Sequence, residues 1–350
     1  MARKKHYLDT DVLTAAKERI HHIADIHDSI AVCFSGGKDS LVVLHLAREV
    51  MAERGHGQIN VIFRDEELIP DTVVDFVESY RVQPWVKMLY FAVPLASSKY
   101  ILGRTYEYTQ WDPDRKHVRP MPDHAIKLPD GVRKVFDQYS MDEHCAGFFK
   151  GKIAFLTGIR ADESIMRFRA SVNKLNENYI NASSFGRVAL CKPIFDWQEN
   201  DVFRFFYDKG IPYCPIYDHQ LLAGRALRVA TPLHSEQSKR IGQLREIDPD
   251  FYNRVLKIFP EMEVQDRYYK DLDRDAIKAK YGADMNGVRS YIDDNITDED
   301  QHNAAMARLR TIASMHRTAP KAYPVDHVLK YFMAGSFKRM VLPVNKKKTL

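Results

Sequence analysis

The chain has 350 residues, of which 45% are hydrophobic and 28% are charged, a composition that is ordinary for a globular protein. It contains no long uncharged apolar run, which argues against a transmembrane helix, and its basic N-terminus leads into an amphipathic stretch rather than an apolar signal core, so a cytoplasmic location is expected. The net charge of +5 permits an anionic partner without requiring one.

Buried strands and amphipathic helices alternate in the first part of the chain. Short apolar runs rich in β-formers predict the strands, and helical spacing of apolar residues predicts the helices. In chain order, the expected elements are a helix at 11–27, a strand at 29–34, a helix at 39–55, a strand at 59–63, a helix at 71–82 and a strand at 86–93. This rhythm predicts an α/β fold with a doubly wound parallel sheet and right-handed crossovers.

The first strand runs directly into the turn Ser-Gly-Gly-Lys-Asp-Ser, residues 35–40, which opens the second helix. In such sheets, ligands lie beyond the carboxyl ends of the strands. Glycines there let backbone N–H groups converge on an anion, and the helix N-terminus adds positive potential. The turn therefore predicts a phosphate or pyrophosphate site. The alternative is a connection in which the glycines serve geometry alone.

The turn is too short for a Walker A loop and does not read G-x-G-x-x-G. Directly after a buried strand, it resembles the PP-loop of the N-type ATP pyrophosphatases, a family that splits ATP between the α and β phosphates. Three segments resemble the phosphoadenosine phosphosulfate (PAPS) reductase branch: 61–77, 153–170 and 192–218. The first carries Asp65 and Pro70-Asp71-Thr72, the second carries Gly158, Arg160, Glu163, Ser164 and Arg167, and the third carries Pro193, Asp196-Trp197 and Ile216-Tyr217-Asp218. Together these resemblances cover roughly residues 28–235.

The resemblance implies an adenine nucleotide alpha hydrolase-like, Rossmann-like fold, with ATP or a related adenine nucleotide and Mg²⁺ at the site. It implies catalytic roles for Lys38, Asp39 and Arg160, and a weak magnesium contact for Asp39 or Asp65. The nucleotide-binding residues that it implies are Phe34, Ser35, Gly36, Gly37, Lys38, Asp39, Ser40, Asp65 and Gly158.

Arg160 follows a fourth expected strand, residues 152–159, so its side chain is expected in the same crevice as the turn. An arginine there can clamp a phosphate or neutralise developing charge. The alternative is that residues 160–170 form an exposed helix held by salt bridges. The candidates for the substrate side of the site are Arg119, Glu163, Arg167, Arg225 and Arg228.

Residues 109–126 form an irregular, aromatic and basic stretch within an expected insert at about 98–130. This stretch resembles an insert of PAPS reductase-like proteins from phage and mobile elements, some found with ParB-like partners. A loop of this kind can cover a site; the alternative is a surface loop anchored by its tryptophan. We expect a nucleotide-binding domain at 1–235 and a helical C-terminal region at 236–350, which packs on the sheet domain or forms an oligomer contact.

The four cysteines, Cys33, Cys145, Cys191 and Cys214, are spread singly, so no iron–sulfur cluster is expected. The Glu-Cys-Gly-x-His segment of PAPS reductases does not occur in these 350 residues. The sequence therefore favours an enzyme that adenylates an unknown acceptor, PAPS reductase-like without being a reductase. The alternatives are a DNA phosphorothioation-type enzyme and a nucleotide-binding regulator acting with a ParB-like partner. Nucleic acid and a second copy of the chain stay open as partners.

Overall fold

The computed structural model describes residues 9–102, 104–164, 167–168, 171, 177–182, 186–224, 227, 229, 231–268, 274–335 and 340–344. The strands are Ser29–Cys33 (β1), Ile59–Arg64 (β2), Val86–Phe91 (β3), Leu95–Ile101 (β4), Arg104–Gln110 (β5), Ile153–Leu156 (β6), Ile180–Ala182 (β7) and Val188–Cys191 (β8). The helices before residue 230 are Val12–Ile26 (α1), Lys38–Glu53 (α2), Asp71–Arg81 (α3), Gln138–Ala146 (α4), the 3₁₀ turn Ala161–Glu163 (η1), Glu199–Lys209 (α6) and Ile216–Leu222 (α7). The later helices are Ser235–Ser238 (α8), Ile241–Ile247 (α9), Pro249–Ile258 (α10), Glu261–Tyr268 (α11), Arg274–Tyr281 (α12), Met285–Asn295 (α13), Glu299–Thr318 (α14) and Val325–Met333 (α15).

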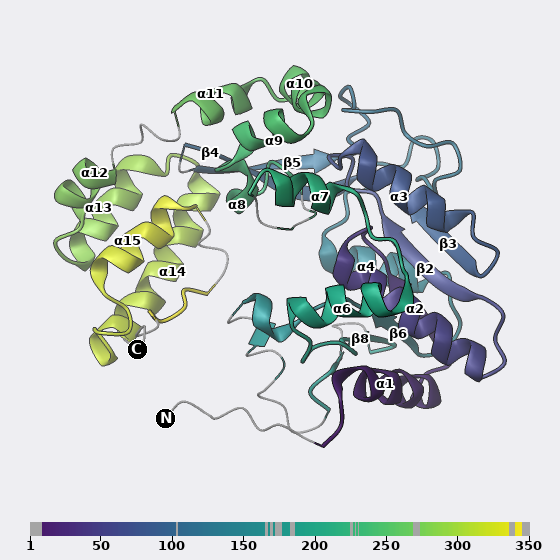
Figure 1. Cartoon of the computed structure of the whole chain (residues 1–350). Coiled ribbons are helices and arrows are strands. Elements are labelled where there is room, and N and C mark those ends of the chain that lie inside the picture. Colours follow the sequence, from purple (N-terminus) through teal and green to yellow (C-terminus); the bar gives the residue numbers. More distant parts are fainter. Residues whose placement is uncertain are drawn as a thin grey trace. The chain divides into compact units, whose positions relative to one another are not determined.

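Within the described residues, the central sheet has six strands in the order β3-β2-β1-β6-β8-β7 (Figure 1). All neighbouring pairs are parallel except β7, which runs antiparallel to β8 at the edge. Val32 of β1 lies opposite Val61 of β2 on one side and Leu156 of β6 on the other. The predicted parallel α/β sheet is confirmed, and the carboxyl ends of β1, β2, β6 and β8 share one edge.

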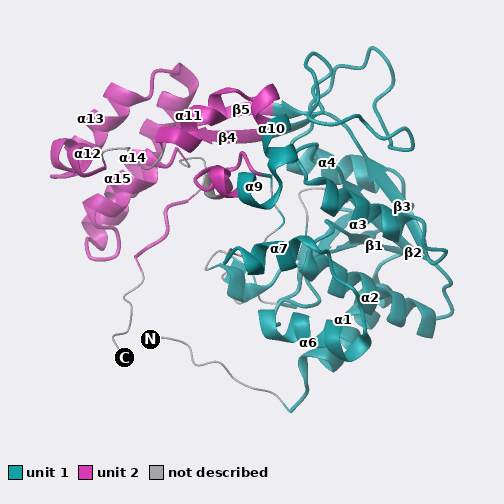
Figure 2. Ribbon diagram, turned by 45° about the horizontal axis from the view of Figure 1, so that its top comes forward, with its two compact units in different colours: residues 1–96, 109–231, 245–254 teal, residues 97–108, 232–244, 255–350 magenta. Residues whose placement is uncertain are grey.

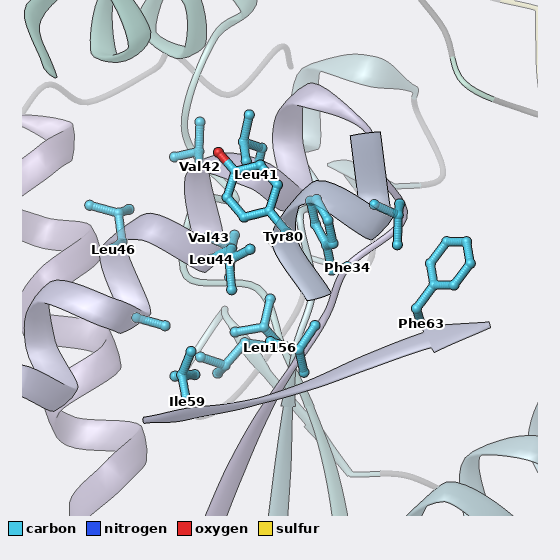
Figure 3. Packing of buried hydrophobic residues seen from close by; sticks show 14 of the residues in the cluster. Phe34, Leu41, Val42, Val43, Leu44, Leu46, Ile59, Phe63, Tyr80 and Leu156 are labelled. Atoms are coloured by element: carbon cyan, nitrogen blue, oxygen red, sulfur yellow. The ribbon is translucent and has the colours of Figure 1, made fainter. Parts of the chain in front are cut away.

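Helices cover both faces of this sheet because successive strand residues point to opposite sides. Val32 and Phe34 pack on the face covered by α1, α2, α3 and α6, where Phe34 lies close to Tyr80 (Figure 3). Ala31 points to the other face, where Met141 of α4 closes a second hydrophobic layer. Burial on both faces explains why β1 and β2 read as continuous apolar runs in the sequence.

The described residues divide into two compact units, coloured separately in Figure 2. Unit 1 comprises the described parts of 1–96, 109–231 and 245–254, and it contains the six-stranded sheet. Unit 2 comprises those of 97–108, 232–244 and 255–350. Most of the β4–β5 hairpin thus belongs to unit 2, although it lies inside the insert expected from the sequence. The expected division into a nucleotide-binding domain at 1–235 and a helical region at 236–350 stays a prediction.

Unit 2 has a hydrophobic core of its own, built by α12, α13, α14 and α15 around side chains such as Ile292, Leu309 and Phe332. After α15, Gly335 adopts φ +64°, and a Cβ there would come within 2.9 Å of the Thr105 backbone nitrogen of β5. Glycine therefore allows the chain to pass close to the hairpin. Among the helices of the described residues, none combines the length and the apolar character needed to cross a membrane.

Candidate functional site

Gly36 shapes the turn between β1 and α2. Its φ is +73°, and a Cβ at this position would lie 2.9 Å from Val73 Cγ1 and 3.0 Å from Val77 Cγ2 of α3. Both facts call for glycine, because the left-handed backbone and the close approach each exclude a side chain. The turn therefore packs directly against α3, and the chain can turn from β1 into α2 without displacing Val73 and Val77.

The two serines of the turn bind each other. The Ser35 N–H donates to Ser40 Oγ at 3.1 Å, the two hydroxyls lie 3.1 Å apart, and the Ser40 hydroxyl donates to the Gly37 carbonyl at 2.9 Å. These bonds close the turn on itself and fix the direction of α2. The serine hydroxyls predicted as phosphate donors thus also hold the shape of the turn.

The N-terminus of α2 is capped by a residue distant in sequence. Gly37 at the N-cap position supplies no side-chain hydrogen bond, and the Lys38 N–H donates instead to the Tyr217 hydroxyl of α7 at 2.8 Å. Tyr217 is buried, and burial raises the pKa of its phenol, so the hydroxyl stays neutral. The first N–H group of α2 therefore donates to a neutral oxygen, although the N-terminus of a helix favours anions.

The three residues with predicted catalytic roles meet in one ion network. Lys38 Nζ lies 3.2 Å from Asp39 Oδ2 and 3.3 Å from both Glu199 Oε1 and the Leu227 carbonyl oxygen. Arg160 Nε donates to Asp39 Oδ1 at 2.7 Å. Lys38 and Arg160 are both buried, so their charges are compensated by carboxylates held within hydrogen-bond distance.

Gly158 and Asp162 explain how Arg160 reaches this network. A Cβ on Gly158 would lie 2.5 Å from the Asp39 carbonyl carbon and the Ser40 nitrogen, so glycine lets the segment after β6 pack against the start of α2. Asp162 then accepts two bonds from Arg160 Nη1, at 2.8 and 2.9 Å. The Arg160 guanidinium is therefore fixed from two sides beside the turn.

A cavity of about 680 Å³ borders Ser35 and extends along the carboxyl edge of the sheet. Its volume lies in the range typical of small-molecule sites. In strand order, its lining residues are Ile62, Arg64 and Glu66 at β2, Cys33, Phe34 and Ser35 at β1, Thr157 and Ile159 at β6, Leu190 and Lys192 at β8, Asn181 at β7, with Gln138 and Asp142 from α4 and with Arg167. The cavity therefore lies beside the turn, where parallel sheets bind ligands.

Charged groups of both signs line this cavity. Arg64 forms an ion pair with Asp142, and Glu66 accepts a hydrogen bond from the Thr231 hydroxyl at 2.6 Å. Burial raises the pKa of the Glu66 carboxyl, while Thr231 and Arg64 act in the opposite direction. Lys192, which is 3% exposed, contributes a further cation at the end of β8. Polar groups therefore occur along the whole length of the cavity.

Asp65 lies outside the residues that line the cavity. It is buried, with Oδ1 accepting from the Glu67 N–H at 2.9 Å and from Arg119 Nη2, and Oδ2 accepting from the Tyr90 hydroxyl at 2.8 Å. Burial raises the pKa of its carboxyl, and the neighbouring Arg119 opposes that rise. The structure thus brings Asp65 and Arg119 together as a buried ion pair, and neither residue is part of the cavity lining.

The insert is fastened to the chain after β2 through Glu67. This residue is fully buried with φ +61°, a backbone conformation that is costly for a residue with a side chain. Its carboxylate accepts the Trp111 N–H at 2.6 Å, the Val118 N–H at 3.0 Å and Arg115 Nη1 at 2.7 Å. The loop 109–126 is therefore held by buried, charge-assisted bonds, and Trp111 is an anchor in the core.

The carboxylates proposed for magnesium do not fit a cation held by the protein. In Asp39, Oδ1 accepts a hydrogen bond from Arg160 and Oδ2 accepts one from Lys38. In Asp65, Oδ1 accepts from Arg119 and from the Glu67 N–H, and Oδ2 accepts from the Tyr90 hydroxyl. Within the part of the chain that the structure describes, no group of three or more His, Cys, Asp or Glu side chains is arranged to hold a metal. A magnesium ion would therefore have to be held chiefly by the phosphates of a nucleotide.

The remaining substrate-side candidates lie in different places. Glu163 forms an ion pair with Arg167, and its carboxylate also accepts the Arg160 N–H at 3.4 Å. Arg167 lines the cavity, whereas Arg225 and Arg228 lie outside the described residues. Of the four cysteines, Cys33 lines the cavity and the other three are buried. Burial raises the pKa of the Cys33 thiol to about 12.

Several cavity residues carry no signal that the sequence analysis used. Asn181 and Leu190 come from β7 and β8, two strands of three and four residues that were not predicted. Gln138 and Asp142 come from α4, which was not predicted either. Asp65 was selected from the sequence, whereas the acidic residue after β2 that lines the cavity is its neighbour Glu66.

The chain is similar to several known proteins. The family model described as the Phosphoadenosine phosphosulfate reductase domain matches residues 29–255 of this chain. The chain is 30% identical over 262 residues to the Uncharacterized protein YbdN of Escherichia coli K12, a match that covers 69% of this chain and 64% of YbdN. It is 24% identical over 192 residues to the Adenosine 5'-phosphosulfate reductase of Bacillus cytotoxicus, covering 55% of this chain and 69% of that protein.

Solved structures with similar folds include PAPS reductase from Candida auris, with a TM-score of 0.34, 14% identity, and coverage of 61% of this chain and 88% of that one. They also include the FMN adenylyltransferase of Candida glabrata with FMN and AMPCPP, with a TM-score of 0.40, 12% identity, and coverage of 65% and 66%. The resemblance noted in the sequence is confirmed by the domain match, which spans well over half of the residues. The chain belongs to the Phosphoadenosine phosphosulfate reductase domain family.

Proposed function

We propose that this protein binds ATP with its phosphates at residues 35–40 and cleaves it between the α and β phosphates to adenylate an acceptor. The observation that carries the proposal is the junction at Ser35, where the cavity meets a turn shaped for close backbone approach at the N-terminus of α2. The nucleoside and the acceptor occupy the cavity, and pyrophosphate leaves towards the turn.

The ion network supports this proposal because phosphoryl chemistry depends mainly on positioning and charge neutralisation. Lys38 and Arg160 are fixed beside the turn by Asp39 and Asp162, so their charges are preorganised. In this account Lys38 balances charge on the leaving pyrophosphate, and Arg160 balances charge that develops at the α-phosphate. Asp39 holds both cations in place.

The thiols support adenylation over reduction by a cysteine nucleophile. A thiolate is the reactive form of cysteine, and burial raises the pKa values of Cys33, Cys145 and Cys214 to about 12, 11 and 11. Cys191 is buried as well. The alternative of DNA phosphorothioation shares the nucleotide-binding step and differs in its acceptor, and the regulator alternative differs in lacking turnover.

The test follows ATP labelled at the α or at the γ phosphate and identifies the products by chromatography, with and without DNA. We expect labelled AMP and pyrophosphate from the wild-type protein and strongly reduced AMP from Lys38→Met. Lys87→Met is the matched control, because Lys87 is an exposed lysine on β3. ADP and phosphate as products would contradict the proposal, and so would nucleotide binding without any turnover.

A further inference from the structure

Basic residues gather towards the C-terminal end of the sequence. Residues 301–350 contain ten Lys or Arg residues and one acidic residue, Asp326, whereas residues 1–300 contain 42 Lys or Arg and 46 Asp or Glu residues. The mild net charge of the whole chain is therefore the sum of two regions of opposite sign. If this protein binds an anionic partner by its charge, the region after residue 300 is the place to look for the contact.

The helix α14 has a buried side and an exposed side. Leu309 and Ile312 are buried in the core that α12, α13 and α15 share with it in unit 2 (Figure 1). Residues three and four apart are neighbours on a helix surface. The exposed residues at this spacing, here called the basic face, are Ala307, Arg310, Ser314 and Arg317. Lys321, also exposed, follows three residues after the helix ends. Because the opposite side is fixed in a core, this face is held in place before any partner binds.

The cations of this region have no acidic partner in the described part of the chain. Within those residues, Arg310, Arg317 and Lys321 form no ion pair, and Asp326 is paired with lysines of α12 and α15. The acids of α14 lie in its first turn, and Arg310 is roughly 16 Å along the helix axis from Glu299. Arg317 in the last turn also stabilises the helix C-terminus, but Arg310 in the middle of the helix lies too far from that end to do so.

The shape of the basic face fits a groove of duplex DNA. Ala307 and Ser314 are small, so the helix backbone can come close to a partner. An α-helix is about 10–12 Å across, and the major groove of B-form DNA is about 12 Å wide, whereas that of A-form RNA is deep and narrow. Binding to a membrane surface requires large exposed apolar residues, and stacking on single strands requires exposed aromatic ones. The basic face carries neither kind.

We propose that unit 2 binds duplex DNA through the basic face of α14, which enters the major groove while Arg310, Arg317 and Lys321 contact phosphates. The inference is independent of the proposed function, because it involves neither the turn nor the cavity. The path of the chain after α15 supports it: the Val344 N–H donates to the Ala322 carbonyl at 2.8 Å, next to Lys321, and three lysines follow within four residues in the sequence. Phosphate contacts make such binding strongly dependent on salt.

The experiment measures fluorescence anisotropy of a labelled DNA duplex with the full chain at several salt concentrations. One variant combines Arg310→Gln, Arg317→Gln and Lys321→Gln. Because each lost phosphate contact lowers the slope of log affinity against log salt by about one, we expect a slope lower by about three and an affinity at least about tenfold weaker at 0.1 M salt. Arg310→Lys with Arg317→Lys keeps the charge and should keep most of the affinity. Circular dichroism confirms that each variant is folded.

The matched control removes the same charge from unit 1. It combines Lys87→Gln, Lys127→Gln and Lys150→Gln, three exposed lysines, and should bind DNA nearly as well as the wild type because salt screens distant charges. An equal loss of affinity in this control overturns the assignment to α14, and so does wild-type protein that binds no duplex. Tighter binding of duplex RNA, polyglutamate or phosphatidylserine vesicles than of DNA overturns the choice of partner. Displacement by netropsin, a minor-groove ligand, but not by methyl green, a major-groove ligand, overturns the choice of groove.

Discussion

Gly36 gives the turn two properties that can be tested separately, a left-handed backbone and close contact with α3. In Gly36→Ala, the new methyl group would meet Val73 at 2.9 Å in a strained conformation, so we expect a loss of roughly 1–3 kcal/mol in the free energy of unfolding. We also expect loss of binding to α,β-methylene-ATP, because the turn must shift. Denaturant unfolding and equilibrium binding measure the two effects.

The matched control for that variant is Gly55→Ala. Gly55 also has a left-handed φ, +83°, but a Cβ there meets nothing within 4 Å. This control reports backbone strain without the clash and lies far from the turn in sequence. Equal nucleotide affinity in the two variants would show that the shape of the turn is irrelevant to binding.

Under the proposed function, Tyr217 would compete with phosphate for the N-terminus of α2. Its hydroxyl accepts the Lys38 N–H, a donor that a phosphate oxygen would otherwise use. In Tyr217→Phe this N–H is released, so we expect the affinity for inorganic pyrophosphate to rise several-fold, as an exchange of one hydrogen bond implies. Calorimetric titration measures the change. Tyr213→Phe is the control, because the Tyr213 hydroxyl donates to Asp218. Weaker pyrophosphate binding in Tyr217→Phe would make the phenol part of the anion site.

The Cys33 thiol should be unreactive although it lines the cavity. With a pKa of about 12, roughly one thiol in 10,000 is ionised at pH 8. We expect slow alkylation by iodoacetamide, and a rate that rises about 100-fold between pH 8 and pH 10 because the thiolate fraction rises tenfold per pH unit below the pKa. Mass spectrometry of the Cys33 peptide follows the reaction. Rapid labelling at pH 8 with a plateau by pH 9 would revive a thiol mechanism.

At the residue scale, the sequence revealed what is local and missed what is distant. Ser35, Gly36 and Lys38 could be selected because they are adjacent and follow an apolar run. Tyr217 lies in the segment 192–218 that resembles the family, but its contact with Lys38 could not be predicted, because 179 residues of sequence separate the two. Asp65 was selected from the sequence as an acid at the end of β2, but its pairing with Arg119 could not be predicted, because it depends on the path of the insert.

At the element scale, Glu67 fastens the insert to the sheet. In Glu67→Gln the negative charge is lost, and the bonds from Arg115 and from the Trp111 and Val118 amides weaken. Because hydrogen bonds to charged groups are stronger than neutral ones, we expect a loss of about 2–3 kcal/mol in the free energy of unfolding. Hydrogen exchange at the Trp111 and Val118 amides should become faster.

Arg133→Gln is the control for the insert, because Arg133 forms an exposed ion pair with Asp114 in the same part of the chain. Exposed pairs contribute little, so this variant should keep the stability and exchange rates of the wild type. If Glu67→Gln behaves like Arg133→Gln, the loop is held by packing of Trp111 rather than by the carboxylate.

The elements that the sequence predicted are those with a strong, continuous pattern. The strands β1, β2 and β3 have five or six residues in apolar runs, and α1, α2 and α3 have helical spacing. By contrast, β7 has three residues, too few to show a period, and α4 carries no clear apolar stripe. The strand β8 was not predicted either, although it has four residues like the predicted β6. Four residues of the cavity wall, Gln138, Asp142, Asn181 and Leu190, therefore come from elements that the sequence did not predict.

At the scale of the whole molecule, the chain does not divide at a single point. It leaves unit 1 after residue 96, returns at 109, and later returns again for residues 245–254. Within that last stretch, Arg254 of α10 forms an ion pair with Asp71 of α3 at 2.7 Å. A change in composition marks where helices take over, but it does not reveal such a return. The doubly wound sheet could be predicted because its alternating pattern is local in the sequence. The interleaving of the two units could not be predicted, because it depends on contacts between distant segments.

The account depends on where the nucleotide lies, and a crystal structure with α,β-methylene-ATP measures this directly. We expect the β and γ phosphates within hydrogen-bond distance of the backbone N–H groups of residues 36–38, with Lys38 released from the Tyr217 hydroxyl. We expect the nucleoside in the cavity between Ile62 and Thr157. A nucleotide bound elsewhere, with the Lys38 N–H still donating to Tyr217, would contradict the central claim that this turn is the phosphate site.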